Sequence, residues 1–296
     1  MKKLLSISFK GTGGHFTAGA AGVAIGAFII VFFLGLVSGM HHAVETKIFP
    51  EEIIEVARSR SEVLDTLSLL SGSKDSSRLI SDRNIERMKR IAGVDDVFPR
   101  VRFRFPAKIW GGREIFGMES GTDVVGDGVP AALLAGEKFA VRFKDYSSAD
   151  SRKKCKEQKD CPAPECCAVE EGKGMGVCTH PVPFILSGKL LEIYNTVIAP
   201  AHNLKRLPEW TLKKFGGLRL NMMTGRSYQG AAIKGKPEKI CMTFAGVSSR
   251  AVDIGITVPI EYAERWNEKY ADSYEKGTYS SAVLKITQKR RLGGII

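Results

Sequence analysis

An uncharged run of apolar and small residues lies near the start of the chain, from Phe16 to Met40. At about 1.5 Å rise per residue, a helix of this length reaches roughly 37 Å and can cross a hydrocarbon core of about 30 Å with some tilt. A cleaved signal peptide is the alternative, because Val37, Ser38 and Gly39 resemble a small-residue cleavage site. Apolar segments of signal peptides usually run about 7–15 residues, so the pattern favours a retained transmembrane helix over residues 16–40.

Beyond this helix, short segments with strand periodicity alternate with short amphipathic segments. Strands are expected at 53–58, 100–110, 182–186, 218–223, 239–247, 252–258 and 279–287. Helices are expected at 81–93, from Ser187 to Pro200, after Pro208, and at 259–270. A hairpin is expected where Gly111 and Gly112 lead into residues 113–118. Because strands and helices are interleaved and several strands form apparent hairpins, we expect an α+β domain of mixed topology.

Start and stop signals delimit the expected helices. Ser81 precedes the first as N-cap and Gly93 follows it as C-cap, whereas Ser187 begins the second and Pro200 ends it. In the last helix, which Pro259 opens, one apolar face is expected to belong to the core: Ala263, Trp266 and Tyr270. In the first, the expected apolar stripe is Ile85, Met88, Ile91 and Ala92.

The strand expected at 100–110 places arginine at every second position, at Arg100, Arg102 and Arg104. Such a row can bind lipid headgroups or acidic ligands. The more common arrangement is the solvated side of an amphipathic strand, and the pattern favours that interpretation.

Charge adds an orientation. The chain carries a net charge of +12, which suits either nucleic acid or anionic lipid as a partner. Lysines precede the apolar helix and mainly glutamates follow it, and cationic flanks stay in the cytoplasm. We therefore expect residues 1–15 to be cytoplasmic and residues 41–296 to form one extracytoplasmic domain at the plasma (inner) membrane, where a nucleic-acid partner is not expected.

Five of the six cysteines fall within a Lys-, Glu-, Pro- and Gly-rich insertion at about residues 146–181. Outside the cytoplasm, clustered cysteines indicate disulfides. No C-x2-C pair supports zinc, although His180 next to Cys178 keeps that alternative open. Cys241 either takes the fifth cysteine or stays a buried free thiol. The disulfide candidates are Cys155, Cys161, Cys166, Cys167, Cys178 and Cys241.

No constellation for catalysis is apparent. None of the five histidines belongs to an H-E-x-x-H motif, and neither a G-x-S-x-G elbow nor a Walker A sequence occurs. The chain is therefore expected not to be an enzyme, with no catalytic residues, no cofactor and no metal.

The apolar helix carries two pairs of glycines spaced by four residues, Gly22 with Gly26 and Gly35 with Gly39. Small residues at this spacing let membrane helices approach closely. At about 100° per residue the two pairs point roughly 140° apart, so the helix is expected to pack between two neighbours.

The order of these features resembles the start of an ABC transporter permease of the MacB/FtsX type, the class that includes lipoprotein-releasing permeases. The resemblance covers most of the chain and is carried by order and spacing, in AGVAIGAFIIVFFLGLVSGMHHAVE, IIEV, GVDDVFPRV, VPFILSGKLLEIYNT and VDIGITVPIEYAERWN. It implies a MacB-like periplasmic core domain and a non-catalytic membrane subunit. It also implies a cytoplasmic ABC ATPase as partner, a second permease copy or paralogue, and mechanical transmission to the outer domain for export or for lipid or lipoprotein handling.

Two features depart from that family. Its members carry three more membrane helices after the core domain, whereas this sequence ends at KRRLGGII, and the cysteine-rich insertion is additional. The chain is therefore expected to be either a fragment of a permease or a single-pass protein whose outer domain acts as a binding or scaffold module.

Overall fold

The structure is a computed structural model that describes residues 21–38, 53–57, 79–113, 119–201, 205–230 and 234–286. The chain divides into two compact units, residues 1–53 and 54–296. In the first, Ala21–Ser38 forms a helix that is long and apolar enough to cross a membrane, although a signal sequence would pass the same test. Residues 16–20 and 39–40 of the expected membrane helix lie outside the described residues.

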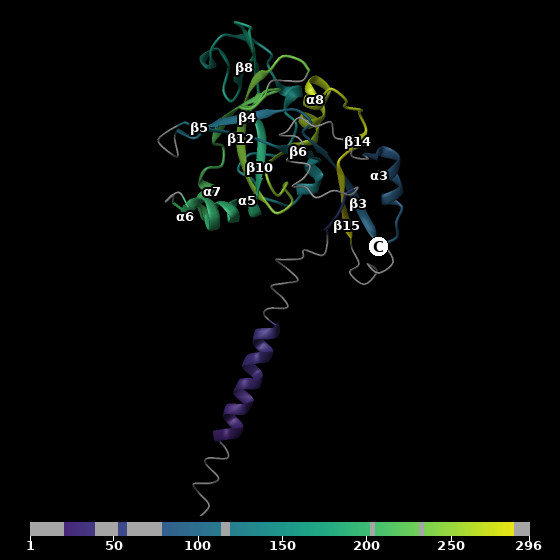
Figure 1. Ribbon diagram of the computed structural model, residues 1–296, viewed down its shortest axis with the longest axis vertical. Helices are drawn as coiled ribbons and strands as arrows, with labels where there is room; N and C mark the ends of the chain where they lie inside the picture. Colours follow the sequence, from purple (N-terminus) through teal and green to yellow (C-terminus); the bar gives the residue numbers. More distant parts are fainter. Residues whose placement is uncertain are drawn as a thin grey trace, which may run out of the picture. The chain divides into compact units, whose positions relative to one another are not determined.

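The second unit is built on one large sheet with the strand order β1-β15-β3-β6-β13-β10-β12-β11-β4-β5 (Figure 1). The strands of this path are β1 (Ile53–Ala57), β3 (Val94–Arg102), β4 (Ala107–Gly111), β5 (Ser120–Asp123), β6 (Gly126–Val129), β10 (Val182–Ser187), β11 (Arg219–Thr224), β12 (Glu238–Ser248), β13 (Ile256–Pro259) and β15 (Ser281–Ile286). Three further strands join it from the insertion, β7 (Lys154–Cys155), β8 (Cys166–Glu170) and β9 (Gly176–Thr179). A separate two-stranded sheet pairs β14 (Thr278–Tyr279) with β2 (Ile80–Ser81).

The sheet is mixed. Strand β10 runs parallel to β12, with Phe184 opposite Phe244, and β13 runs parallel to β6. Antiparallel pairs include β11 with β12 and β15 with β3. Together with the helices, this mixed topology confirms the expected α+β class.

The main core lies where helix α8 (Ile260–Tyr270) packs against β3, β6 and β13. The expected face of α8 is buried, with Ala263 and Tyr270 fully inaccessible and Trp266 only 7% exposed. Trp266 meets the rings of Phe103 and Phe105 edge-on, at centroid distances of 5.6 and 6.2 Å. Aromatic rings in this geometry add to the free energy gained from burial, so α8 holds the centre of the sheet in place.

A smaller core forms where helix α3 (Asp82–Lys89) covers β3 and β15. Ile85 of the expected stripe is buried, but Ile91 is 38% exposed and Ala92 is exposed as well. The apolar stripe is shorter than expected because α3 ends at Lys89, one turn before Gly93, the expected C-cap. Gly93 has a positive φ of 97°, which lets the chain turn directly into β3.

The strand expected at 100–110 is wrong in one respect, because the chain breaks between β3 and β4. Pro106 has no amide hydrogen and cannot continue a ladder. The buried side chain of Asn267 on α8 satisfies the backbone at the break, accepting from Arg104 N at 2.8 Å and donating to Arg102 O at 2.9 Å. Strand β4 then pairs with β5, and residues 114–118 of the expected hairpin lie outside the described residues.

The helix after Ser187 is longer than Pro200 suggested. Helix α5 (Gly188–Ile193) continues as a π-helical turn, η5 (Tyr194–Ile198), and then as α6 (Ala199–Ala201). Ser187 caps α5 as expected, accepting from Lys189 N at 3.0 Å. Proline lacks the amide hydrogen that an α-helix needs and crowds the preceding turn, and the wider π turn lets the chain run through it. Helix α7 (Glu209–Lys214) follows at the expected place.

Candidate functional site

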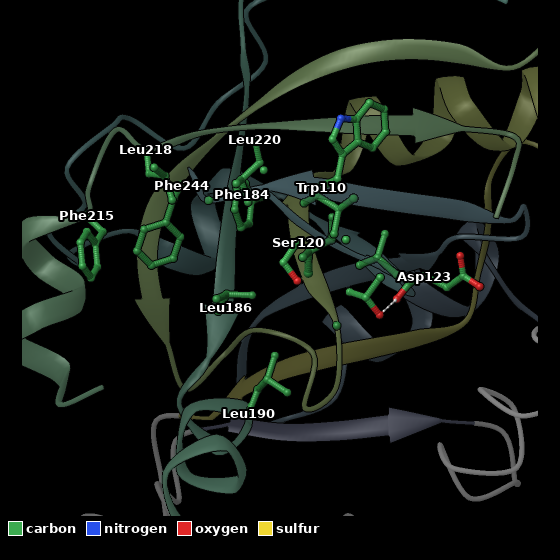
Figure 2. A pocket seen from close by; sticks show the side chains of 18 of the residues that line it. Trp110, Ser120, Asp123, Phe184, Leu186, Leu190, Phe215, Leu218, Leu220 and Phe244 are labelled. Atoms are coloured by element: carbon green, nitrogen blue, oxygen red, sulfur yellow. Dashed lines mark hydrogen bonds between the residues drawn. The ribbon is translucent and has the colours of Figure 1, made fainter. Parts of the chain in front are cut away.

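A cavity of about 440 Å³ opens between the sheet and the α5–α7 segment (Figure 2). Alternate residues of β10, Phe184 and Leu186, point into it, and so does Phe244 from β12. Leu190 of α5 and Phe215, which follows α7, close the helical side. A cavity of this size and apolar character suits a hydrocarbon chain or an aromatic ring.

The rim of this cavity is polar along β4 and β5. Asp123 is the one ionisable residue among those that line it in the described part of the chain. Its carboxylate accepts the backbone amide of Tyr228 at 2.6 Å. The ammonium of Lys108 lies 4.7 Å from the centre of the Tyr228 ring and 6.0 Å from that of Trp110. The lining itself therefore carries one carboxylate, which is bound to a backbone amide, and is otherwise mainly apolar.

The arginine row does not form the solvated face that its alternation suggested. Arg100 is only 7% exposed and extends to Asp127 on β6, with Nε 3.2 Å from Oδ2. These two atoms lie outside hydrogen-bond geometry, so the contact is ionic. Glu55 on β1 adds a second carboxylate at 3.6 Å, and the Arg250 carbonyl accepts from the guanidinium at 2.9 Å.

Burial dominates the electrostatics of this cluster. Removal of Asp127 from water raises its pKa, and Arg100 and the hydroxyl of Thr257 offset only part of that effect. A buried carboxylate tolerates this environment because both partners are in place. We therefore regard Arg100 as a structural residue that joins three strands, rather than as a binding residue.

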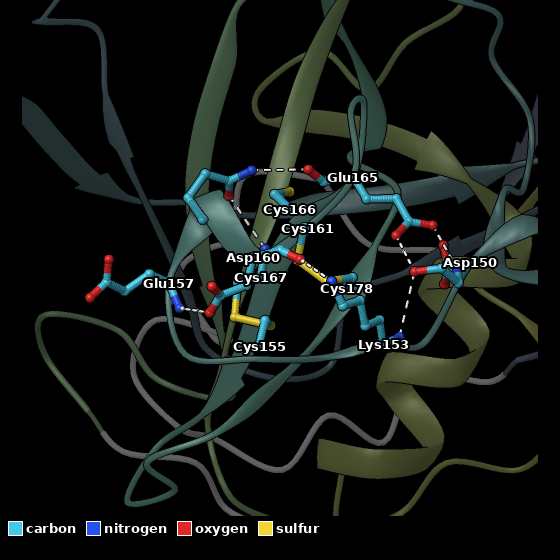
Figure 3. The surroundings of a disulfide bond; sticks show 12 residues. Asp150, Lys153, Cys155, Glu157, Asp160, Cys161, Glu165, Cys166, Cys167 and Cys178 are labelled. Carbon is cyan, nitrogen blue, oxygen red and sulfur yellow. Dashed lines mark hydrogen bonds between the residues drawn. A yellow bond between two sulfur atoms is a disulfide. The ribbon is translucent and has the colours of Figure 1, made fainter.

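The structure brings all six cysteines into bonded pairs, and Figure 3 shows those of the insertion. Cys155 joins Cys167 and Cys161 joins Cys178, both within the insertion. The third bond links Cys166 on β8 to Cys241 on β12, so Cys241 does take the remaining cysteine of the cluster. Of these residues, Cys155, Cys167 and Cys178 form a small buried cluster, which gives this polar segment a core.

The insertion contacts the rest of the domain at several places. At its start Arg265 of α8 donates to both oxygens of Asp145, at 2.7 and 3.0 Å. Next to it, Tyr146 N donates to the hydroxyl of Tyr262 at 3.0 Å. Further along, β8 pairs with the start of β12. In Figure 1, β8 and the α5–α7 segment that forms the helical side of the cavity lie at opposite ends of the domain, although the insertion also reaches β11, where Arg219 donates to the carbonyl of Pro164 at 3.0 Å.

Three glycines of the apolar helix have no close neighbour among the described residues. No heavy atom lies within 4 Å of where a Cβ would stand on Gly22, Gly26 or Gly35, and Gly39 lies outside the described residues. The large apolar side chains of Ala21–Ser38 are exposed as well. This helix has the surface of a segment that needs lipid or other helices around it.

Two candidate sites in the structure were not predicted from the sequence. The cavity is assembled from residues of several separated segments, each of which reads locally as ordinary core. A cluster of Asp150, Glu165 and His180 forms at the insertion, although these residues are up to 30 positions apart. Only the nearness of His180 to the cysteines hinted at it.

No family model and no curated protein matches this chain. Among solved structures, the extracellular domain of the noncanonic ABC-type transporter YknZ from Gram-positive bacteria is similar at 12% identity and a TM-score of 0.33, covering 81% of this chain and 87% of that chain. The periplasmic region of MacB from Actinobacillus actinomycetemcomitans is similar at 9% identity and a TM-score of 0.32, covering 80% and 76%. Likeness at this level does not assign a role to the chain.

Proposed function

We propose that this chain is the membrane-anchored outer part of a transport permease, with its α+β domain outside the cytoplasm. The observation that carries the proposal is an exposed apolar helix, Ala21–Ser38, ahead of an α+β domain whose six cysteines pair as disulfides. Disulfides persist where the surroundings are oxidising. The resemblance of the sequence to MacB/FtsX-type permeases supports the same role.

In this role the chain holds no chemistry of its own. An ABC ATPase on the cytoplasmic face hydrolyses ATP, and membrane helices transmit the resulting motion to the outer domain. The sheet suits mechanical transmission because β1, the first strand described after the membrane helix, joins the edge of the sheet beside β15. Glu55 of β1 also accepts from the Ser281 hydroxyl at 2.6 Å and pairs with Arg100.

We assign the contacts within the membrane to the two glycine pairs. Gly22 and Gly26 present one close-packing face and Gly35 with Gly39 another, so the helix packs between two neighbours, from a second permease copy or from a paralogue. These contacts are van der Waals contacts that larger side chains abolish.

The test is purification of the tagged full-length chain in mild detergent from the membranes of its own host. A stoichiometric Walker-type ATPase and a second permease copy or paralogue are expected to accompany it, and the double substitution Gly22→Leu/Gly26→Leu is expected to release the permease partner. Val23→Leu is the matched control, because it changes size without touching a small-residue face. A chain that purifies without any ATPase, both in mild detergent and after cross-linking in the membrane, contradicts the proposal.

The apolar cavity favours a second function, binding of an apolar or amphiphilic ligand by the outer domain. Its test is the fluorescence of phenylnaphthylamine, an apolar probe that brightens out of water. Leu186→Gln places an amide on the cavity wall and is expected to weaken the affinity for the probe by about tenfold. A loss of this size corresponds to the contribution of one buried apolar side chain. Met175→Gln is the control, because Met175 is 46% exposed and lies in the insertion. Equal binding by all three proteins would exclude the cavity as the binding site.

A further inference from the structure

Asp150, Glu165 and His180 direct their side chains to a common point at the edge of the insertion. Nδ1 of His180 lies 3.0 Å from Oδ1 of Asp150 and 3.6 Å from Oε1 of Glu165. One ligand atom from each of the three residues lies within 4.8 Å of the other two. Figure 3 shows Glu165 extending toward the segment that carries Asp150, beside the disulfide-bonded strands.

The three side chains are largely removed from solvent. Their exposed fractions are 12% for Asp150, 5% for Glu165 and 19% for His180. Two carboxylates so close together and so little hydrated are stabilised by hydrogen-bond donors and by a cation between them. Ser151 supplies donors to Glu165, and a divalent metal ion would supply two positive charges.

The spacing of the donor atoms suits a metal. Bonds of about 2.0–2.2 Å from zinc to histidine nitrogen and carboxylate oxygen separate tetrahedral ligand atoms by roughly 3.3–3.5 Å. The 3.0 Å separation is a hydrogen bond between Nδ1 and Oδ1 of Asp150 in this structure, which a bound ion would replace, and the 3.6 Å separation from Glu165 already lies close to the range. One nitrogen and two oxygens fit Zn²⁺ better than Ca²⁺, which takes six to eight oxygens.

Neighbouring groups hold the three donors in place without the ion. Oδ1 of Asp150 accepts the backbone amide of His180 at 2.7 Å, and Oε1 of Glu165 accepts that of Ser151 at 2.6 Å. The Ser151 hydroxyl donates to the other oxygen of Glu165. The ring of Tyr146 stacks on the imidazole at 5.7 Å and 14°. Supporting contacts of this kind orient metal ligands.

The disulfides fix the backbone on both sides of the cluster. Glu165 directly precedes Cys166, which is bonded to Cys241, and His180 lies two residues after Cys178, which is bonded to Cys161. The other group of converging donors, Cys155, Cys161 and Cys167, is used up in disulfides and offers no thiolate. A metal in the insertion would therefore be held by the carboxylates and histidine, not by cysteine sulfur.

We propose that Asp150, Glu165 and His180 form a binding site for one divalent transition-metal ion, with Zn²⁺ as the best fit. Three protein ligands leave at least one coordination position for water or for a group from a partner. The site lies on the insertion, so it is independent of the transport role proposed above.

The test is zinc binding by the full-length oxidised chain in detergent, after removal of metal with a chelator. Wild type is expected to bind one zinc ion. His180→Gln and Asp150→Asn are each expected to weaken the zinc affinity by about a hundredfold or more, because each removes a ligand or the charge of one. Saturating zinc is expected to raise the melting temperature of wild type and not of either variant. Glu157→Gln is the control, because this carboxylate is 65% exposed in the same insertion.

Co²⁺ in place of zinc gives a readout that does not depend on a variant's stability. Wild type is expected to show the intense visible absorption of four-coordinate cobalt with nitrogen and oxygen ligands, without a cobalt–thiolate charge-transfer band. Disulfide mapping and the melting temperature without metal show whether each variant is folded. Equal zinc affinity in wild type and in folded His180→Gln, or no zinc binding by wild type, would overturn the proposal and leave His180 as a hydrogen-bond partner of Asp150.

Discussion

At the scale of single residues, the attachment of the insertion depends on Asp145. Burial by itself would raise the pKa of this carboxyl, but the bidentate Arg265 guanidinium, together with the amide and hydroxyl of Ser147, outweighs burial and lowers it. A carboxyl with a lowered pKa stabilises the folded state when it is ionised. This contribution is complete above its ordinary value near 3.8 and is lost as the pH falls through the lower folded value.

Asp145→Asn is expected to lower the free energy of unfolding by about 1 kcal/mol at pH 7, since the pair is partly exposed. The difference from wild type is expected to shrink below about pH 4, where the wild-type carboxyl takes up its proton. Urea unfolding at pH 7, 5 and 3 measures it. Asp253→Asn removes the pair with Lys189, whose side chain is 67% exposed, and serves as the control. A difference that stays constant down to pH 3 would contradict the account.

At the scale of elements, the position of α8 depends on the absence of a side chain at Gly128 of β6. A Cβ at this position would stand 2.5 Å from the Cβ of Ala263 and 2.8 Å from the Cα of Ile260. Neither atom can move aside without moving the helix. The glycine therefore sets the distance between α8 and the sheet.

Gly128→Ala is expected to destabilise the domain by about 1–3 kcal/mol, the usual cost of overpacking a core. Gly174→Ala is the matched control, because no heavy atom lies within 4 Å of its Cβ position. Thermal unfolding of both proteins measures the difference. Equal melting temperatures would show that α8 does not pack as closely as described.

The elements also show what periodicity can predict. The buried face of α8 follows from Ala263, Trp266 and Tyr270 alone, because helical spacing is local. The break between β3 and β4 is only partly local, because Pro106 marks it but the backbone there is satisfied by Asn267, some 160 positions away. The order of strands in the sheet is set by the same kind of distant contact.

Candidate sites follow the same division. The disulfide candidates could be predicted from the residue type and its clustering. The burial of Arg100 could not, because it depends on Asp127, which nothing near Arg100 in the sequence indicates. The cavity and the cluster around His180 likewise draw on segments that only the fold brings together.

At the scale of the whole molecule, the fold of the insertion depends on disulfides, which persist in an oxidising compartment. The pairs Cys155–Cys167 and Cys161–Cys178 are expected to close the insertion on itself, and Cys166–Cys241 to fasten it to β12. Removal of a native disulfide typically costs about 2–5 kcal/mol. Cys161→Ala/Cys178→Ala is therefore expected to lower the melting temperature and to loosen the insertion in hydrogen exchange while the core around α8 stays protected.

Partial reduction followed by alkylation and peptide mass analysis assigns the three pairs, and it separates the adjacent Cys166 and Cys167. Six alkylated thiols in unreduced protein, or a different pairing, would contradict the structure of the insertion.

The central claim is that the apolar helix anchors an outer domain on the extracytoplasmic side. A recognition sequence for a site-specific protease, placed between Lys173 and Gly174 in an exposed turn of the insertion, tests it in intact spheroplasts. The same sequence placed after Lys10 is the control. We expect added protease to cut the first protein in intact spheroplasts and the second only after lysis. Cleavage at the insertion that also requires lysis would contradict the account.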